Sequence, residues 1–153
     1  MQKKLLNSMT ICQIEFATPE YDEAVQLRLE VLRRPLGLVF APEQLATEWD
    51  NIHLAAFNHA GRMVGYLNLT PENDTIIKMR QVAVAPLNQG KGVGTALVAF
   101  SEIRANELLY KEITLHARKT AVPFYLQLGY ELLGDEFEEV TVPHFKMKKS
   151  INS

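Results

Sequence analysis

Apolar residues recur along this chain with two different periods, and each period predicts a different kind of element. Alternation of apolar and polar residues favours strands, whereas apolar residues three and four positions apart favour helices. The alternating segments predict strands at about 11–16, 52–58, 63–69, 75–84, 113–117, 131–133 and 142–147. Helical spacing predicts helices at about 18–34, 42–49, 92–109 and from 121 onward. The predicted order of elements is therefore β-α-α-β-β-β-α-β-α-β-β.

The first predicted helix has recognisable start and stop signals. Thr18 can cap its N-terminus, and Pro19 suits the first helical position because its missing N–H needs no partner there. Glu20 adds a negative charge where the helix dipole is positive. The helix is expected to end near Arg34, since Pro35 disfavours helical geometry in the residue before it.

A glycine-rich turn, Asn88 to Thr95, lies between the predicted strand at 75–84 and the predicted helix at 92–109. Such a turn can present a row of backbone N–H groups to an anion, and the positive end of the helix dipole adds attraction. The turn therefore predicts a phosphate or pyrophosphate ligand, and hence a nucleotide-containing cofactor.

Two common phosphate-binding loops do not fit the spacing of this turn. The dinucleotide fingerprint G-x-G-x-x-G needs a third glycine where Thr95 stands. The P-loop needs a glycine at the position of Ala85, and a serine or threonine directly after Lys91. What remains is the pattern Gln89-x-x-Gly92-x-Gly94, with Val82-Ala83-Val84 just upstream.

This pattern resembles motif A of the GNAT superfamily of acetyl-CoA-dependent N-acetyltransferases, which is written R/Q-x-x-G-x-G/A. A second segment, Ala121 to Tyr130, resembles motif B of the same superfamily, in which a short helix carries A-x-x-F-Y and ends at G-F/Y. The two motifs occur in the order that the family requires. The resemblance covers roughly residues 11–149, which is nearly the whole chain.

The resemblance implies a fold as well as an activity. The predicted order of elements is the GNAT order, which implies an α/β fold with a mixed sheet flanked by helices. The sheet would be splayed between the strands at 75–84 and 113–117. We expect a single GNAT domain over 11–149, between an N-terminal extension at 1–10 and a C-terminal tail at 150–153. A chain of 153 residues is long enough for one domain with a full core.

The implied reaction is acetyl transfer from acetyl-CoA to a primary amine, made directly in a ternary complex. By resemblance, backbone N–H groups of the glycine turn would hold the pyrophosphate, and the pantetheine arm would pair with the strand before it. An N–H at Val82 or its neighbour would polarise the thioester carbonyl, although Val82 and Val84 are equally plain sheet core. The implied coenzyme A-binding residues are Val82, Ala83, Val84, Gln89, Gly90, Lys91, Gly92, Val93, Gly94, Thr95 and Phe124.

Tyr125 is the side chain that the resemblance assigns as the acid for the departing thiolate; the alternative is a tyrosine on the helix surface or in the core. Many family members carry a general base as a carboxylate on the strand before motif A, but here that strand reads Lys78-Met79-Arg80-Gln81-Val82. The base must come from elsewhere, or a water chain must carry the proton. His116 is the leading candidate, because imidazole suits proton transfer at neutral pH. The alternative is a histidine satisfied within the fold.

The acceptor wall is expected from the first two helices and their link. Arg28 and Arg33 could receive an anionic group of the acceptor through bidentate hydrogen bonds; alternatively, Arg33 and Arg34 face solvent. His144 is a further candidate for lining the acceptor pocket. The run Asp135 to Glu139 is expected to be a solvated loop, with attraction of a cationic amine as the alternative. The two remaining histidines, which lie in or beside a predicted hairpin, are expected to be structural or solvated: His53 and His59.

Composition narrows the class of protein. With 47% hydrophobic and 22% charged residues, the chain has an ordinary globular composition. A formal charge of −2 without a basic stripe argues against nucleic acid as a partner. No segment reaches the roughly 20 apolar residues of a membrane span, the N-terminus lacks a signal peptide's apolar region, and no ligand spacing predicts a metal. The single Cys12 cannot form an internal disulfide, so we expect a cytoplasmic protein. A homodimer is kept open.

Two other functions are compatible with these motifs. The missing strand carboxylate would also fit a non-catalytic acyl-CoA-binding or sensing module. The same fold could use an acyl group longer than acetyl. The acceptor is left open between a small amine, an amino sugar, an amino acid and a protein terminus.

Overall fold

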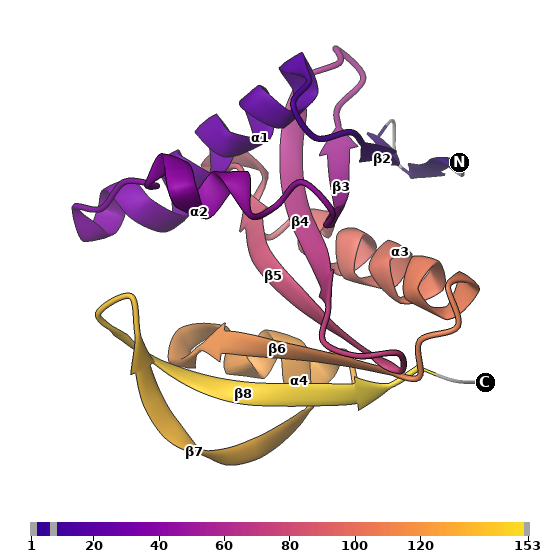
Figure 1. The fold of residues 1–153 in the computed structure, drawn as a ribbon. Helices are drawn as coiled ribbons and strands as arrows, with labels where there is room; N and C mark the ends of the chain where they lie inside the picture. The colour runs from indigo at the N-terminus through magenta and orange to yellow at the C-terminus, as the bar shows by residue number, and fades with distance from the viewer. Residues whose placement is uncertain (1–2, 7–8, 152–153) are drawn as a thin grey trace. The chain divides into compact units, whose positions relative to one another are not determined.

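The computed structural model describes residues 3–6 and 9–151, and it divides into two compact units (Figure 1). The first unit comprises Met1–Thr70 and Gln81–Ser101, and the second comprises Pro71–Arg80 and Glu102–Ser153. Strand β5 (Ile76–Val84) and helix α3 (Val93–Glu107) each contribute several residues to both units, and the last residue of strand β4 (Met63–Pro71) lies in the second unit.

The first unit is built on antiparallel strands in the order β1-β2-β3-β4, with the end of β5 beside β4. Their bounds are β1 (Lys3–Leu6), β2 (Met9–Ile14), β3 (Ile52–Phe57) and β4 (Met63–Pro71). The register pairs Ile11 with Ala56, and Ala55 with Tyr66. Strand β1 lies within the predicted N-terminal extension. The pattern at Lys3–Leu6 has no alternation that would have predicted a strand there.

Helix α1 (Pro19–Arg28) begins as predicted, because the Tyr21 N–H donates to Thr18 Oγ1 at 3.2 Å and Pro19 occupies the first turn. The helical path then changes geometry instead of continuing as an α-helix to Arg34. A π-helical turn spans Leu29–Arg33, and a 3₁₀ turn spans Arg34–Leu36. Helix α2 (Pro42–Ala46) follows and is shorter than the predicted helix at 42–49.

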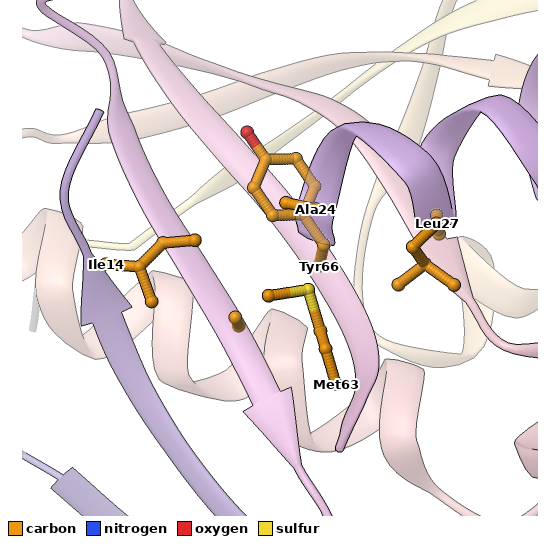
Figure 2. Packing of buried hydrophobic residues seen from close by; sticks show 7 residues of the cluster. Ile14, Ala24, Leu27, Met63 and Tyr66 are labelled. Carbon is orange, nitrogen blue, oxygen red and sulfur yellow. The ribbon is translucent and has the colours of Figure 1, made fainter. Parts of the chain in front are cut away.

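The core of the first unit has two faces. On one face, an apolar cluster joins α1 to the sheet (Figure 2); its members are Ile14, Ala24, Leu27, Ala55, Met63, Tyr66 and Ala83. Neighbouring residues of a strand point to opposite faces, so Gly65 faces away from this cluster. A Cβ built on Gly65 would lie 2.7 Å from side-chain atoms of both Val93 and Leu97. The start of α3 is therefore packed directly on β4 through a position without a side chain.

The second unit has its strands in the order β5-β6-β8-β7. The bounds of its other elements are β6 (Glu112–Arg118), α4 (Val122–Gln127), β7 (Glu131–Glu139) and β8 (Val142–Ser150). Strand β6 is parallel to β5 and antiparallel to β8, so the sheet is mixed. Helix α4 lies behind β6 and β8 in Figure 1. The registered pairing of β5 with β6 ends at Met79 and Leu115.

The predicted order of elements is confirmed, with β1 added before it. One expectation is wrong: the acidic run is not a loop but the second half of β7, which continues the strand predicted at 131–133. Strand β7 lies at the edge of the sheet, and it is largely exposed. An edge strand tolerates charged residues on both faces, so the run lacks the alternation by which strands are recognised.

Candidate active site

The glycine turn has the geometry of an anion-binding loop. Gly90 and Gly92 adopt φ values of 75° and 86°, which favour glycine, and a Cβ built on either would meet nothing within 4 Å. The Gln89 side chain donates from Nε2 to the Val84 carbonyl at 3.1 Å, which ties the turn to the end of β5. Helix α3 begins at Val93, and the first N–H groups of a helix have no carbonyl one turn before them. The open backbone at the positive helix end fits a phosphate or pyrophosphate.

Strand β5, which leads into this turn, has an unusual backbone at Gln81. Its φ of 58° lies in the left-handed region, which side chains other than glycine rarely adopt. Farther along, Ala83 is buried in the apolar cluster, and the Ala85 N–H donates to the Val64 carbonyl at 2.9 Å. Val82 and Val84 are half-buried. The three residues Val82-Ala83-Val84 are therefore sheet residues, as the sequence predicts.

Tyr125 lies on α4 in the second unit and is buried among aromatic rings. Its ring centroid is 4.9 Å from that of Phe124 and 5.8 Å from that of Tyr130, in edge-on arrangements. Burial raises the pKa of Tyr125 well above its ordinary value. The hydroxyl is therefore protonated at neutral pH, which is the state that a proton donor needs.

His116 lies on β6 within a cluster of charged and polar groups of the second unit. Its Nδ1 is 2.9 Å from Glu139 Oε1 and 3.3 Å from Lys78 Nζ. One ring nitrogen faces both groups, so it can donate to the carboxylate or accept from the amine, but not both at once. The ring of Phe137 packs edge-on against it, with centroids 5.0 Å apart.

His144 approaches the same carboxylate from β8. Its Nε2 is 3.8 Å from Glu139 Oε2, and its Nδ1 is 2.9 Å from the Val142 carbonyl, which can only accept. Partial burial raises the pKa of Glu139, but the hydrogen bond from His116 and the charges of His116, His144 and Lys78 outweigh it. The net effect is a lowered pKa of Glu139. Burial lowers the pKa of Lys78.

Glu139 is the residue of this cluster that sequence reasoning missed. The strand before the glycine turn carries no carboxylate between Lys78 and Val82. The structure brings one to His116 from β7, through the β7–β8 hairpin and the pairing of β8 with β6. The signal in the sequence is the acidic run itself, for which the composition predicts a solvated loop.

Arg28 does not present its guanidinium to a ligand as predicted. Its side chain is fully buried, and Nη1 and Nη2 donate to the two oxygens of Glu48 at 2.9 and 2.6 Å. The Tyr21 hydroxyl donates to the same carboxylate at 2.7 Å. The anion that Arg28 receives is therefore internal, and the correction follows from a long-range ion pair between α1 and the segment after α2.

The remaining candidates lie as follows. Arg33 is buried with its guanidinium carbon 4.5 Å from the centre of the Phe40 ring, so the alternative in which Arg33 faces solvent is wrong. Arg34 is exposed. His53 is buried and hydrogen-bonded, and His59 is exposed, as expected of structural and solvated histidines.

Within residues 3–6 and 9–151, no helix has the length and apolar character needed to cross a membrane. Nor do the described side chains include a group of three His, Cys, Asp or Glu residues that could hold a metal ion.

Comparison with known proteins identifies the family. A model of the acetyltransferase (GNAT) domain matches residues 23–151. A UPF0039 protein of Schizosaccharomyces pombe is 28% identical over 98 residues, which are 63% of this chain and 65% of the relative. Mycothiol acetyltransferase of Nocardia farcinica is 48% identical over 46 residues, which are 30% of this chain and 15% of that protein. The chain thus spans less than two thirds of the length of these curated relatives.

Solved structures show the same fold. A Lactobacillus plantarum protein assigned as an N-acetyltransferase has a TM-score of 0.83 at 21% identity, over 95% of this chain and 99% of that one. An aminoglycoside 6'-N-acetyltransferase complexed with coenzyme A has a TM-score of 0.78 at 17% identity, over 94% and 97%. A GNAT acetyltransferase from Elizabethkingia anophelis with acetyl-CoA bound has a TM-score of 0.73 at 16% identity, over 95% and 99%. With the family model covering most of its length, the chain belongs to the GNAT acetyltransferase family.

Proposed function

We propose that this protein transfers the acetyl group of acetyl-CoA to a primary amine, directly, in a ternary complex of enzyme, donor and acceptor. The observation that carries the proposal is the glycine turn, where left-handed Gly90 and Gly92 leave open backbone at the N-terminus of α3. Membership of the GNAT family supports the general reaction. Relatives of the same fold were solved with coenzyme A or acetyl-CoA bound, which supports the donor.

In this proposal the donor is held mainly by backbone. The N–H groups from Gln89 to Thr95 bind the pyrophosphate, and Val82-Ala83-Val84 pairs with the pantetheine arm. Phe124 packs against the same arm. The Gln89 side chain acts indirectly, since its bond to the Val84 carbonyl fixes the turn relative to the strand. The full set proposed for the donor is Val82, Ala83, Val84, Gln89, Gly90, Lys91, Gly92, Val93, Gly94, Thr95 and Phe124.

In the proposed reaction one covalent bond forms, another breaks, and two protons are transferred. The amine nitrogen attacks the thioester carbonyl carbon, a C–N bond forms, and the C–S bond breaks. The nitrogen loses a proton to a base, and the departing sulfur takes up a proton from an acid. The products are an N-substituted acetamide and the free thiol of coenzyme A. Donors aimed at the carbonyl oxygen would stabilise the charge that develops there.

We propose Tyr125 as the acid and His116 as the base. The place of Tyr125 on α4, within the segment that resembles motif B, supports the first role, and its hydroxyl carries a proton at neutral pH. The contacts of His116 with Glu139 at 2.9 Å and with Lys78 at 3.3 Å support the second, because they orient the imidazole and offer a route for its proton. Glu139 thus takes the place of the carboxylate that β5 lacks.

For the acceptor, the buried Arg33 and His144 stay our candidates for lining the site. Arg28 lies inside the expected acceptor wall, where it joins α1 to the segment after α2 through its two hydrogen bonds to Glu48. Structural relatives include an aminoglycoside acetyltransferase and the ribosomal-protein-S18-alanine N-acetyltransferase of Escherichia coli. We therefore propose a small-molecule or peptide amine as the acceptor. The predicted cytoplasmic location and homodimer stay predictions.

The test is thiol release from acetyl-CoA over a panel of amines, namely amino sugars, amino acids, polyamines and peptides with a free N-terminus. At least one amine should give release that depends on amine concentration. Gly92→Ala is the matched control, because φ of 86° is strained for alanine, and this variant should lose donor affinity. Stabilisation by acetyl-CoA with no turnover over the panel would favour the binding or sensing module. No stabilisation by any acyl-CoA at saturation would overturn the donor site itself.

A further inference from the structure

Three buried side-chain oxygens on neighbouring strands of the first unit have no hydrogen-bond partner among the residues that the structure describes. They are Asn68 Oδ1 and Thr70 Oγ1 on β4, and Gln81 Oε1 on β5. A buried polar atom without a partner destabilises the folded state, because no hydrogen bond offsets the loss of its hydration. Native structures keep few such atoms, and each calls for an explanation such as a water, an ion or a ligand. Each of the three oxygens therefore calls for a hydrogen-bond donor.

The orientation of the Asn68 amide follows from a chain of hydrogen bonds behind it. Burial lowers the pKa of His53, so its ring is neutral at pH 7. His53 Nε2 is 3.0 Å from the Glu48 carbonyl, which can only accept, so the single ring proton lies on Nε2. His53 Nδ1 is therefore an acceptor, and the Tyr66 hydroxyl at 2.7 Å must donate to it.

The same hydrogen-bond directions determine which atom of the Asn68 amide is left without a partner. Since Tyr66 gives its proton to His53, its oxygen accepts from Asn68 Nδ2 at 3.2 Å. The amide cannot be turned around without breaking this chain, so Asn68 Oδ1 is the atom left without a donor. Figure 2 shows the Tyr66 hydroxyl directed away from Met63 in the apolar cluster. Asn68 is thus held by an internal network and presents an acceptor oxygen.

Gln81 and Thr70 provide the other two buried oxygens without a hydrogen-bond partner. Residues two apart on a strand share a face, so Thr70 lies on the same face of β4 as Asn68 and Tyr66. Strand β5 is the neighbour of β4, and the bond from the Ala85 N–H to the Val64 carbonyl lies at the other end of this pair. Counting back along the hairpin from that bond brings Gln81 near Asn68. The left-handed backbone of Gln81 is the kind of strain that is retained at functional sites.

We propose that the oxygens of Asn68, Thr70 and Gln81 form a subsite for the ammonium group of the acceptor. Three acceptor oxygens match the three N–H bonds of a primary ammonium, whereas an alcohol offers a single donor. An anion would be repelled by two amide oxygens. The nearby charge of Arg28 is balanced by Glu48 at 2.6 Å, so it does not oppose a cation. This inference rests on the proposed amine acetylation, and it assigns the acceptor class as a primary amine that binds protonated. The ammonium nitrogen has no lone pair, so it first gives one proton to solvent; the neutral amine then attacks, and the proton it loses on forming the amide goes to the base.

The experiment compares near-isosteric pairs of variants. Gln81→Met and Thr70→Val remove an oxygen and keep the shape, whereas Gln81→Glu and Thr70→Ser keep an acceptor. The first pair should raise the amine KM about tenfold each, since a hydrogen bond to a charged group contributes about 1.5–3 kcal/mol. The acetyl-CoA KM should stay within about twofold. The second pair should keep the amine KM near that of the wild type.

A second readout needs no turnover: the melting temperature of each variant without ligands, and its shift by n-butylamine in the presence of coenzyme A. If the oxygens serve a ligand, Gln81→Met and Thr70→Val should not lower the unliganded melting temperature, and they should lose the butylamine shift. Lower melting temperatures with an unchanged amine KM would overturn the inference and show internal structural roles. If amine turnover is unaffected in all variants, the inference about the subsite is wrong, whereas the proposed function stands. Donor binding without any amine turnover or shift would overturn it together with the proposed function.

Discussion

At the scale of single residues, the charged cluster of the second unit shows where sequence reasoning ended. His116 and His144 were predicted from residue type and position, because imidazole suits proton transfer. Their shared partner, Glu139, lies 23 residues from His116 along the chain. Its approach depends on two strand registers, β6 with β8 and β7 with β8, which no local pattern specifies. Candidate acids and bases can be recognised locally, whereas the group that orients them is a product of the tertiary fold.

The lowered pKa of Glu139 gives a prediction for stability against pH. A carboxylate with a lowered folded pKa stabilises the protein above its unfolded pKa of about 4.3, and this contribution is lost as pH falls through the folded value. The wild type should therefore exceed Glu139→Gln in free energy of unfolding at neutral pH, and the difference should shrink below about pH 4.3. Urea unfolding at several pH values measures it. The exposed Glu138→Gln serves as the control, and a difference that grew in acid would contradict the assignment.

Tyr125→Phe tests the proposed acid against a purely structural tyrosine. Turnover should fall about a hundredfold, at the low end for general acid catalysis, because a thiolate already leaves readily. The acetyl-CoA dissociation constant should not change. The matched control is Tyr130→Phe, whose hydroxyl donates to Glu102 at 3.0 Å and should affect stability rather than rate. Steady-state kinetics and calorimetric titration with acetyl-CoA measure the two effects, and a wild-type rate for Tyr125→Phe would exclude it as the acid.

At the scale of elements, the pattern of apolar residues was sufficient wherever an element has one buried face. The predicted starts of α1 and α3 and the positions of β3, β4 and β5 agree with the structure to within a residue or two. The predictions of elements fail where burial does not alternate along the chain, because apolar residues then show no regular spacing. Strand β7 is an exposed edge, and β1 lacks alternation. The π-helical turn at Leu29–Arg33 follows Arg28, whose ion pair with Glu48 depends on distant residues.

Gly65→Ala tests whether close packing of α3 on β4 positions the glycine turn. A Cβ at Gly65 would lie 2.7 Å from Val93 and Leu97 side-chain atoms, so the start of α3 must shift. We expect a loss of about 1–3 kcal/mol in stability, as for other overpacked sites, and weaker binding of acetyl-CoA. Chemical denaturation and calorimetric titration measure the two losses.

The control for this crowding is a second substitution. Leu97→Ala in the Gly65→Ala background creates space beside the new methyl group. If crowding is the cause, the two changes should be less destabilising together than the sum of their separate effects. Strict additivity would contradict direct contact.

At the scale of the whole molecule, the order of elements and two short motifs were enough to predict the GNAT family, which the domain match confirms. The single domain expected over 11–149 stays a prediction, and the fold within it divides into two compact units. The chain crosses between them three times, at the end of β4, within β5 and within α3. The first crossing has a proline, Pro71, and a polar turn after it, whereas the other two have no glycine, proline or polar linker by which a boundary is recognised. The groups proposed for the donor pyrophosphate lie in the first unit, whereas Tyr125 and His116 lie in the second.

This division leads to a prediction about acetyl-CoA and unfolding. Helix α3 and strand β5 contribute hydrogen bonds to both units, so opening one unit removes bonds from the other, and the two should unfold as one cooperative structure. A ligand present at a hundred times its dissociation constant stabilises the folded state by about 2.7 kcal/mol. Hydrogen exchange read by mass spectrometry should therefore slow in β3 of the first unit and also in β8 of the second when acetyl-CoA is added. Slower exchange confined to the first unit would show that the shared elements do not couple the two.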